Sequence, residues 1–435
     1  MIIPNLAHDT VMRSVKKVIG HSDDKVTQRR MKMVDFYEGE YDEHITPFFE
    51  GGVKLPPALP NFTHRMVSAR SLVYKDRPAR LNERYTEYLP QDIDSKMGQM
   101  EKMTFLTGNM CMSSNFDGEK LQYDIIPYFF PMFLEGSTKE AAVFYPIANM
   151  NDKTKRMYEF WSRTTDDHIG MHMKFDEKGK IHFHEDNVFD ILPFTFAKRN
   201  QELVDEYWQA GALDIVSAQE HVAILYTEAM IAARIDALGI KYVTGVMQDT
   251  PIRAGVEEII MLPDGSTMNK LPAGDLNKIV ELIKFIIQDT ASNNHLVARW
   301  ADSQANSGVQ VKMENLENYE ARAASVEDTW RPFEHNRFKV DQAILAANNI
   351  NVDDDYHVDF TEPETVHDPK ELRDQYDWEL VNGLTTKRRI LEELNPDLDE
   401  ESVKELLGEI EEEAQQAQPE EPLLEGLREL GTLGA

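Results

Sequence analysis

The sequence predicts an α+β fold that is mostly helical. Long stretches carry apolar residues three and four positions apart, which is typical of amphipathic helices. A block of short apolar runs between Met112 and Phe196, separated by Gly, Asp, Asn and Lys, is typical of strands and turns. With 435 residues, the chain is long enough for about two or three domains with a well-buried core.

Composition indicates a soluble globular protein, with 41% hydrophobic and 28% charged residues. A single cysteine, Cys111, excludes an intrachain disulfide and favours a reducing compartment, and we expect it to be a small buried apolar residue. We see no secretory signal at the start. The longest apolar run, Ile125 to Leu134, contains two prolines and is too short to span a bilayer. We therefore expect no membrane association.

Net charge is the strongest compositional signal, at −31. Thirteen acids and only Lys404 and Arg428 lie in the last forty residues. Such a surface repels phosphate, which argues against tight static binding of nucleic acid. It is compatible with a wall along which DNA slides with weak contacts.

The first 200 residues predict helices followed by strands. Helices are expected at 7–38, 61–75 and 93–107, and Asp176–Lys180 has the composition of a hairpin turn. This β-rich part belongs to an otherwise helical chain.

The middle of the chain predicts two helices around a small insertion. A helix of roughly 35 residues runs from Leu203 to Leu238 and is closed by Gly239. Residues 240–274 form a compact insertion with strand-like runs at 241–246 and 259–262, and a second helix with a regular apolar stripe follows at 275–290. This pattern indicates an elongated limb with a small tip, whose apolar stripes neighbouring copies would cover.

A polar loop at 292–309 separates this limb from another long helix, Leu316 to Asn348. Because Pro332 lacks a backbone donor, we expect a kink there. A short strand at 358–360, helices at 369–380 and after Gly383, and an acidic helix capped by Asp399 follow, and the remaining residues are expected to be mobile.

This order of elements resembles that of the portal proteins of tailed bacteriophages. The family has a long helix, a small clip, a second helix, a tunnel-facing loop, a Ser-Gly-X-X-X-Lys-like segment and another long helix, and here Ser307–Lys312 corresponds to that segment. Val358–Pro363, Leu380–Lys387 and Leu391–Asp397 follow the family's closing pattern, whereas Asp35–Glu40 and Leu59–Val67 match more loosely. Ser307-Gly continues with Val-Gln-Val, where a small Ala before the Lys is more usual.

The resemblance implies an elongated subunit with wing, stem, clip and crown regions. Its expected parts are a wing of helices and strands (1–202), a stem helix (203–239), a clip (240–274), a second stem helix (275–291), a tunnel loop (292–309), a wing helix and strand (310–365), a crown (366–413) and an acidic flexible tail (414–435).

For function, the resemblance implies a ring, usually of twelve subunits, at one capsid vertex of the virion, assembled in the host cytoplasm. The ring would be the channel for packaging and ejection of double-stranded DNA. It would dock the large terminase ATPase and the head-tail adaptor, and contact the major capsid protein and the scaffolding protein. The alternatives are an acidic-site, metal-dependent nuclease of the packaging machinery and a non-portal capsid or scaffold component.

The resemblance also selects candidate contact residues. Those expected to approach DNA from the tunnel loop are Asn293, Asn294, Arg299, Asp302, Gln304 and Lys312. Those expected to contact an adaptor or a neighbour from the clip are Arg253, Glu257, Glu258 and Lys270. Trp300 is expected to pack under the loop. Solvated surface charge is an equally good interpretation of the clip residues, and pairing with an acid is the default for Lys312.

Catalytic and metal-binding patterns are weak. His168, His172, His182 and His184 are close in sequence but lack a third ligand fixed by spacing, and Asp353–Asp355 lacks the Gly and Glu of a calcium loop. Phosphate-binding loops, nucleophile elbows and zinc-protease motifs are absent from the sequence. We therefore predict no catalytic residue, no metal and no cofactor, and expect the energy for DNA translocation to come from another protein.

Overall fold

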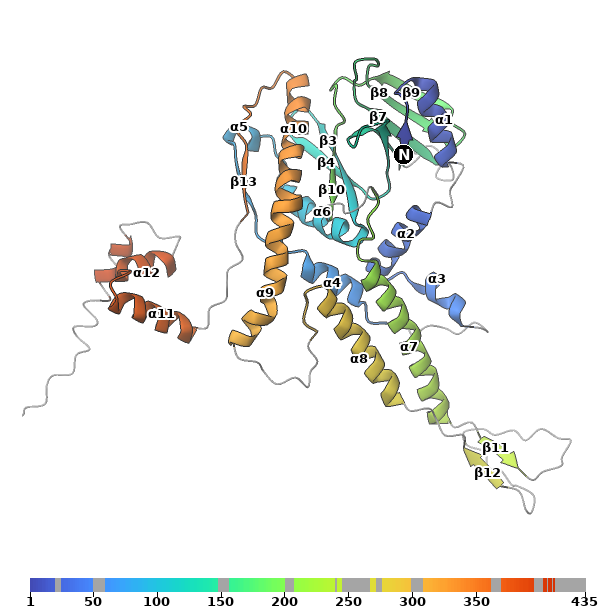
Figure 1. The fold of residues 1–435 in the computed structure, drawn as a ribbon, viewed down its shortest axis with the longest axis vertical. Coiled ribbons are helices and arrows are strands. Elements are labelled where there is room, and N and C mark those ends of the chain that lie inside the picture. The colour runs from blue at the N-terminus through green and yellow to red at the C-terminus, as the bar shows by residue number, and fades with distance from the viewer. Residues whose placement is uncertain are drawn as a thin grey trace, which may run out of the picture. The chain divides into compact units, whose positions relative to one another are not determined.

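The computed structural model describes residues 1–19, 25–49, 59–147, 156–199, 207–238, 241–244, 267–270, 276–298, 308–360 and 369–394, with short parts of 402–410 (Figure 1). The chain divides into two compact units, one made of 1–304 with 313–363 and the other of 305–312 with 364–435. Within the described residues, the helices are all too short or too polar to cross a membrane.

The first unit begins with short helices: α1 (His8–Ile19), α2 (Lys25–Glu38), α3 (Asp42–Ile45), α4 (Phe62–Arg70), α5 (Glu83–Thr86) and α6 (Ile93–Thr107), with a 3-10 turn at Thr46–Phe48. The sequence predicts one helix over 7–38, where the structure has α1 and α2. Asn61 caps α4 by accepting from the backbone N–H of His64. That helix ends at Arg70, five residues before the predicted end, whereas α6 has the predicted bounds.

The β-rich block forms two sheets. Six strands lie in the order β1-β5-β6-β7-β8-β9, namely β1 (Ile2–Ile3), β5 (Phe130–Leu134), β6 (Glu140–Ile147), β7 (Met157–Ser162), β8 (Met171–Asp176) and β9 (Ile181–Asp186). Strand β1 is parallel to β5, and the other pairs are antiparallel. The hairpin predicted at Asp176–Lys180 is confirmed as the turn between β8 and β9, with Gly179 at φ +75°.

A second sheet has three antiparallel strands in the order β10-β3-β4, namely β3 (Asn109–Phe116), β4 (Leu121–Ile126) and β10 (Phe194–Lys198). Successive side chains of β3 point to opposite faces of the sheet. Met110 and Met112 pack with α6 and the later helix α10 (Arg331–Ala347), while Cys111 packs against Val143 of the six-stranded sheet. The predicted burial of Cys111 is confirmed, and burial raises the pKa of its thiol well above the usual value.

The limb predicted in the middle of the chain consists of α7 (Leu213–Leu238), a two-stranded antiparallel pair β11 (Lys241–Thr244) and β12 (Thr267–Lys270), and α8 (Leu276–Asn293). Figure 1 shows α7 and α8 side by side, with β11 and β12 beyond them. Helix α7 starts ten residues later than predicted. The predicted strand at 259–262 lies outside the described residues.

Helix α9 (Gly308–Ser325) continues through a π-helical segment, Val326–Trp330, into α10. It starts eight residues earlier than the predicted Leu316. A regular helix would need a hydrogen bond from residue 332 to the carbonyl group of Asp328, which proline cannot donate. The π-helical turn spans that carbonyl group, at the position where the sequence predicts a kink. A short antiparallel pair, β2 (Ala79–Leu81) with β13 (His357–Asp359), lies beside α10.

In the second unit, α11 (Pro369–Val381) and α12 (Lys387–Leu394) are joined by a turn at Gly383, which has φ +67°. Both helices lie where the sequence predicts them. Helical residues also occur at 402–404 and 406–408. The predicted tail, 414–435, lies outside the described residues.

Candidate functional site

The residues predicted to face DNA begin at the end of α8. Asn293 is exposed and its amide lies 3.4 Å from Asp289. Asn294 is only 4% exposed, and its amide donates to the Asp214 carboxylate at 2.7 Å and to the Thr290 carbonyl at 3.0 Å. The structure thus leaves Asn293 accessible and holds Asn294 inside the protein.

The other predicted contact residues are not described at the level of side chains. Lys312 lies in α9 and Lys270 in β12, each with its backbone only. Arg299, Asp302, Gln304, Arg253, Glu257 and Glu258 lie outside the described residues, as does Trp300.

The first residues after α8 are fastened to the helix. His295 has φ +57°, and the backbone N–H groups of His295 and Leu296 donate to the carbonyl groups of Ser292 and Ala291. The His295 ring lies 3.5 Å from the Glu317 carboxylate of α9. The predicted tunnel loop therefore leaves α8 through a fixed turn.

A cavity of about 390 Å³ adjoins this turn. Its walls come from α4, α6, the residue after β10, the end of α8 and the junction of α9 with the π-helical segment. Among the lining residues are Arg70, Glu101, Thr104, Arg199, Asn294 and Arg322. Volumes of roughly 300–1,000 Å³ are typical of small-molecule sites.

Arginines dominate the charge of this cavity. Arg70 donates to the side chain of Asn318 at 3.1 Å, and the buried Arg322 donates to the Leu72 carbonyl at 3.1 Å. Arg199 donates to the Gly211 carbonyl at 2.6 Å, and its guanidinium lies 3.9 Å from the centre of the Phe105 ring. Burial lowers the pKa of Arg199 to about 10; the nearby Asp214 carboxylate opposes this shift, and Arg70 adds to it. Sequence reasoning missed these residues, since isolated arginines far apart in the chain give no pattern.

Glu101 is the buried acid of the same wall. Its two carboxylate oxygens accept the backbone N–H groups of Val73 and Tyr74, at 2.9 and 3.1 Å. Burial raises its pKa to about 7. The carboxylate therefore holds the chain that follows α4 against α6.

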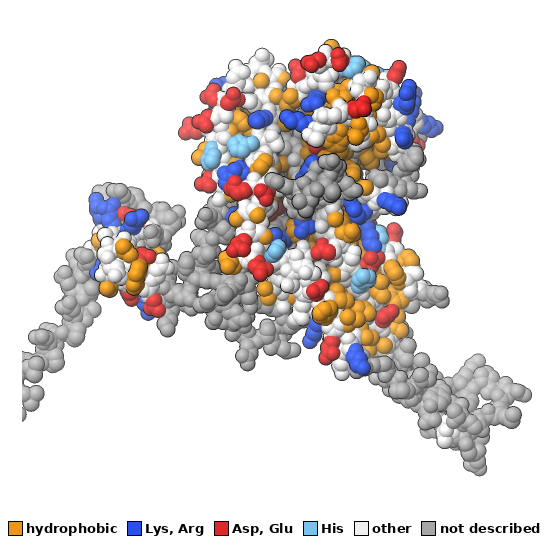
Figure 2. Space-filling model, viewed as in Figure 1, with side chains coloured by type: hydrophobic (Ala, Val, Ile, Leu, Met, Phe, Trp, Pro, Cys, Tyr) orange, Lys and Arg blue, Asp and Glu red, His pale blue; other side chains and the backbone are white. Residues whose placement is uncertain are grey.

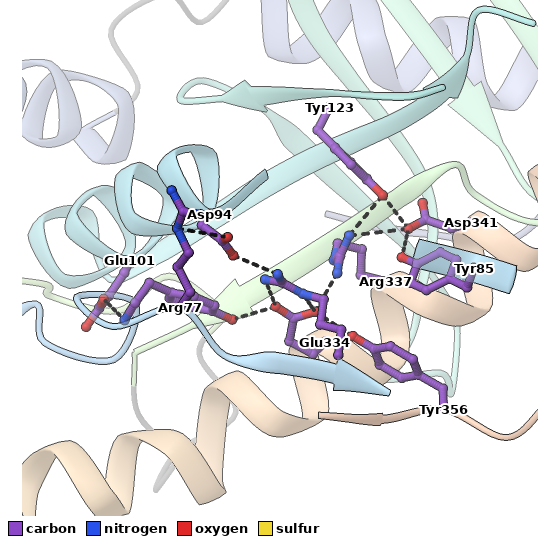
Figure 3. A network of polar contacts seen from close by, with 11 residues as sticks. Arg77, Tyr85, Asp94, Glu101, Tyr123, Glu334, Arg337, Asp341 and Tyr356 are labelled. Atoms are coloured by element: carbon purple, nitrogen blue, oxygen red, sulfur yellow. Dashed lines mark hydrogen bonds and ion pairs between the residues drawn. The ribbon is translucent and has the colours of Figure 1, made fainter. Parts of the chain in front are cut away.

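A buried polar network fixes α10 to the rest of the first unit (Figure 3). Glu334 and Arg337 are fully buried and pair with each other, and Arg80 of β2 bridges Glu334 at 2.9 Å and Asp94 at 2.7 Å. The hydroxyls of Tyr74 and Tyr356 donate to Glu334 as well. Burial alone would raise the pKa of Glu334, but the charges of Arg337 and Arg80 lower it to about 2.

The other end of this network is Asp341. It accepts hydrogen bonds from the hydroxyls of Tyr85 and Tyr123, at 2.5 and 2.7 Å, and lies 3.5 Å from Arg337. Burial raises its pKa. Helix α10 is thus tied to β2, α5, α6 and β4 through charged and phenolic groups, which fixes its direction relative to the three-stranded sheet.

Apolar side chains are exposed on the limb. Ile283, Ile286 and Ile287 of α8 pack into the core shared with α7. By contrast, Phe285 is 63% exposed, and Val280, Leu282 and, on α7, Met230 are exposed too. Figure 2 shows hydrophobic side chains gathered over these two helices.

Three of the four histidines singled out in the sequence have side-chain contacts of their own. His172 lies between Glu159 and Glu185, at 2.7 and 2.8 Å, and stacks on Trp161. His182 lies 3.3 Å from Asp176, and the ring of His184 is 6.0 Å from that of His8. Over the part of the chain that the structure describes, His, Cys, Asp and Glu form no group of three that could hold a metal ion.

The Asp353–Asp355 segment is likewise held by the protein. The side-chain amide of Asn82 donates to the backbone carbonyls of Asp353 and Asp355, at 3.2 and 2.8 Å. The carboxylate of Asp354 accepts from Gln342 at 2.6 Å. These contacts fasten the segment to α10 and to the start of α5.

Comparisons with known proteins gave matches among solved structures only. No family model and no curated protein matches the sequence. A chain in the virion of a native gene transfer agent particle is 9% identical, with 76% of this chain and 88% of that chain covered and a TM-score of 0.36. A chain in the neck of an empty particle of this kind, computed with C6 symmetry, is 11% identical, with the same coverage and a TM-score of 0.38.

The third structure is an HK97-family phage portal protein from Corynebacterium diphtheriae. It is 12% identical, with 72% of this chain and 95% of that chain covered and a TM-score of 0.31. The chain is similar to a phage portal protein in structure as well as in the order of its sequence elements.

Proposed function

We propose that this chain is the subunit of a phage portal ring, a channel for packaging and ejection of double-stranded DNA at one vertex of the capsid. Support comes from the order of its elements: α7, a small two-stranded insertion, α8, a polar segment and the long helix formed by α9 and α10. The resemblance of the sequence to portal proteins rests on this same order of elements.

The observation that carries the proposal is the exposed apolar surface of the limb. Phe285, Leu282 and Val280 of α8 and Met230 of α7 are directed away from the core that the two helices share. Full burial of one such side chain stabilises an assembly by about 1.5–3 kcal/mol. A ring covers this surface on every subunit, because each copy meets the same two neighbours.

The negative charge of the chain determines how strongly the proposed channel holds DNA. With −31 per chain, the assembled wall repels the DNA backbone, so DNA is held weakly and can slide. In this proposal, Asn293 and the residues that follow it (Arg299, Asp302, Gln304 and Lys312) make the transient contacts. Arg253, Glu257, Glu258 and Lys270 serve the clip, which would meet the head-tail adaptor. The large terminase, the major capsid protein and the scaffolding protein are the further proposed partners, and the subunit has no catalytic role.

Mass is the direct test. Twelve copies of a 50.0 kDa chain give a particle of about 600 kDa. We expect such a particle in light scattering after size exclusion, and rings with an open centre in negative-stain averages viewed along the axis. A chain that stays single-copy at high concentration, with the limb uncovered, would contradict the proposal. A single-copy chain that hydrolyses DNA with added magnesium would indicate the nuclease instead.

A further inference from the structure

Two guanidinium groups of the cavity beside α8 face one aromatic ring. Arg199 lies 3.9 Å and Arg70 5.9 Å from the centre of the Phe105 ring. Their hydrogen bonds go to neutral groups, the Asn318 side chain and the Gly211 carbonyl. Across the described residues, neither guanidinium has a carboxylate within ion-pairing distance. The two charges are partly withdrawn from water, and Arg70 acts on Arg199 to lower its pKa. Like charges in such surroundings are costly unless an anion neutralises them.

A third polar group of the wall also lacks a partner. Thr104 lines the cavity, is 1% exposed, and its hydroxyl makes no hydrogen bond with the described residues. A buried hydroxyl without a partner costs about 1–3 kcal/mol. This hydroxyl is available to donate a hydrogen bond to a ligand oxygen in the cavity.

Two carboxylates act on these arginines only from beyond ion-pairing distance: Glu101 opposes the lowering of the Arg70 pKa and Asp214 that of the Arg199 pKa, yet burial keeps both pKa values lowered. Both carboxylate oxygens of Glu101 are engaged by backbone N–H groups, and Asp328 is exposed at the rim. The lining thus contains three arginines against two acids. This excess of positive charge contrasts with the protein's overall charge of −31.

We infer that this cavity is a binding site for a phosphate group, held between the Arg70 and Arg199 guanidiniums with the Thr104 hydroxyl as a further donor. Guanidinium forks match the oxygens of phosphate, and charge-assisted hydrogen bonds of this kind are among the strongest in proteins. The phosphate is either a free anion or belongs to the DNA backbone, and the cavity adjoins the turn from which the predicted tunnel loop departs.

The test is calorimetric titration of the purified full-length protein with inorganic phosphate at constant ionic strength. We expect saturable binding with one site per chain. Arg199→Gln and Arg70→Gln should each weaken it by about tenfold or more, which is the loss expected for a charge-assisted hydrogen bond. Arg84→Gln is the matched control, because Arg84 is an exposed arginine that does not line the cavity, and it should bind phosphate like the parent protein.

Thr104→Val keeps the test decisive if an arginine variant fails to fold. Because the hydroxyl has no partner, we expect this variant to fold at least as stably as the parent and yet to bind phosphate more weakly. Phosphate binding that is unsaturable, or equally strong in the Thr104, Arg70 and Arg199 variants, would overturn the inference.

A duplex DNA competitor then distinguishes the two sources of phosphate. Displacement of phosphate by the duplex assigns the site to the DNA backbone, and retained phosphate binding in its presence assigns it to a free anion. Either result supports the site. The outcome is separable from the proposed portal function, because ring mass tests the portal and phosphate binding tests the cavity.

Discussion

At the scale of single residues, the Glu334 carboxylate is the group on which the buried polar network converges. It is fully buried, and its charge is offset by Arg337 and Arg80, while the Tyr74 and Tyr356 hydroxyls supply further donors. A buried ion pair contributes little net stability compared with a well-packed apolar pair. Removal of one partner, however, leaves buried charges with fewer groups of opposite charge around them. The network therefore acts mainly on the position of α10, because any displacement of this helix would separate buried charges from their partners.

We expect Glu334→Gln to reduce the free energy of unfolding by about 3–5 kcal/mol, because Arg80 and Arg337 lose their common counter-charge. Urea denaturation followed by circular dichroism measures this. Glu327→Gln is the matched control, since Glu327 also pairs with an arginine of α10, Arg331, but is 65% exposed in its side chain. That change should shift the free energy by less than about 1 kcal/mol. Equal effects of the two substitutions would contradict the assigned role of the network.

The cost of Glu334→Gln should also depend on pH. The pKa of Glu334 is lowered from 4.5 to about 2 in the folded protein, so its ionised form stabilises the fold above pH 4.5. This contribution is lost as pH falls through about 2. Between these values, the difference in stability between parent and variant should shrink by about 1.4 kcal/mol per pH unit. Denaturation curves at pH 7, 4 and 3 measure it, and a difference that stays constant down to pH 3 would disagree with the lowered pKa.

At the scale of elements, the start of α7 is decided by Gly211 rather than by the apolar pattern. Gly211 has φ +61°, and a Cβ atom there would lie 2.3 Å from the Leu106 carbonyl oxygen and 2.7 Å from the Thr107 carbonyl carbon. The backbone of 207–212 follows the end of α6, where the N–H of Ala212 donates to Leu106. The helix can begin only after this close approach.

Gly211→Ala should therefore destabilise the protein by about 2–5 kcal/mol, the combined cost of a left-handed backbone and an overpacked contact with backbone atoms. Gly118→Ala is the comparison, because Gly118 also has a positive φ, at +102°, but has open space around its Cβ position. It should cost about 1–2 kcal/mol. Thermal unfolding of both variants measures the difference, and equal shifts would show that the contact with Leu106 and Thr107 is not limiting.

The sequence predicts the bounds of an element well where residues within or next to that element determine them. Helix α6 has its predicted bounds because its apolar residues start at Ile93 and Gly108 ends it. Where the outcome depends on a distant neighbour, prediction fails. The start of α7 depends on Leu106, about a hundred residues earlier. Helix α9 begins at Gly308, inside the segment that the sequence predicts to be a polar loop.

The candidate site divides in the same way. The sequence ends this helix at 290, three residues before the Asn293 at which α8 ends. Only the fold shows that Asn294 is turned inward to Asp214. It also brings Arg70 and Arg199 onto the ring of Phe105 from separate elements. Neither arginine stands in a motif, so nothing short of the tertiary structure could select them.

At the scale of the whole molecule, charge would oppose the proposed ring and apolar surface would favour it. Twelve chains of −31 would carry about −370 charges, and this repulsion must be overcome at the interfaces. Apolar contact is the contribution that does not weaken with salt, whereas repulsion between exposed charges is screened beyond about 8 Å at physiological ionic strength. A ring held mainly by the limb should thus depend on its apolar side chains.

Phe285→Asp tests this dependence, because it replaces the most exposed apolar side chain of α8 by a charge that every neighbour would repeat. We expect the particle of about 600 kDa to give way to smaller species in sedimentation velocity at physiological salt. Ile169→Asp is the matched control, since Ile169 is also 63% exposed but lies between β7 and β8, away from the limb, and its variant should assemble like the parent. Both single chains should unfold within about 0.5 kcal/mol of the parent, because neither side chain is buried in the isolated subunit. Assembly that survives Phe285→Asp unchanged would mean that the limb is not the interface that closes the ring.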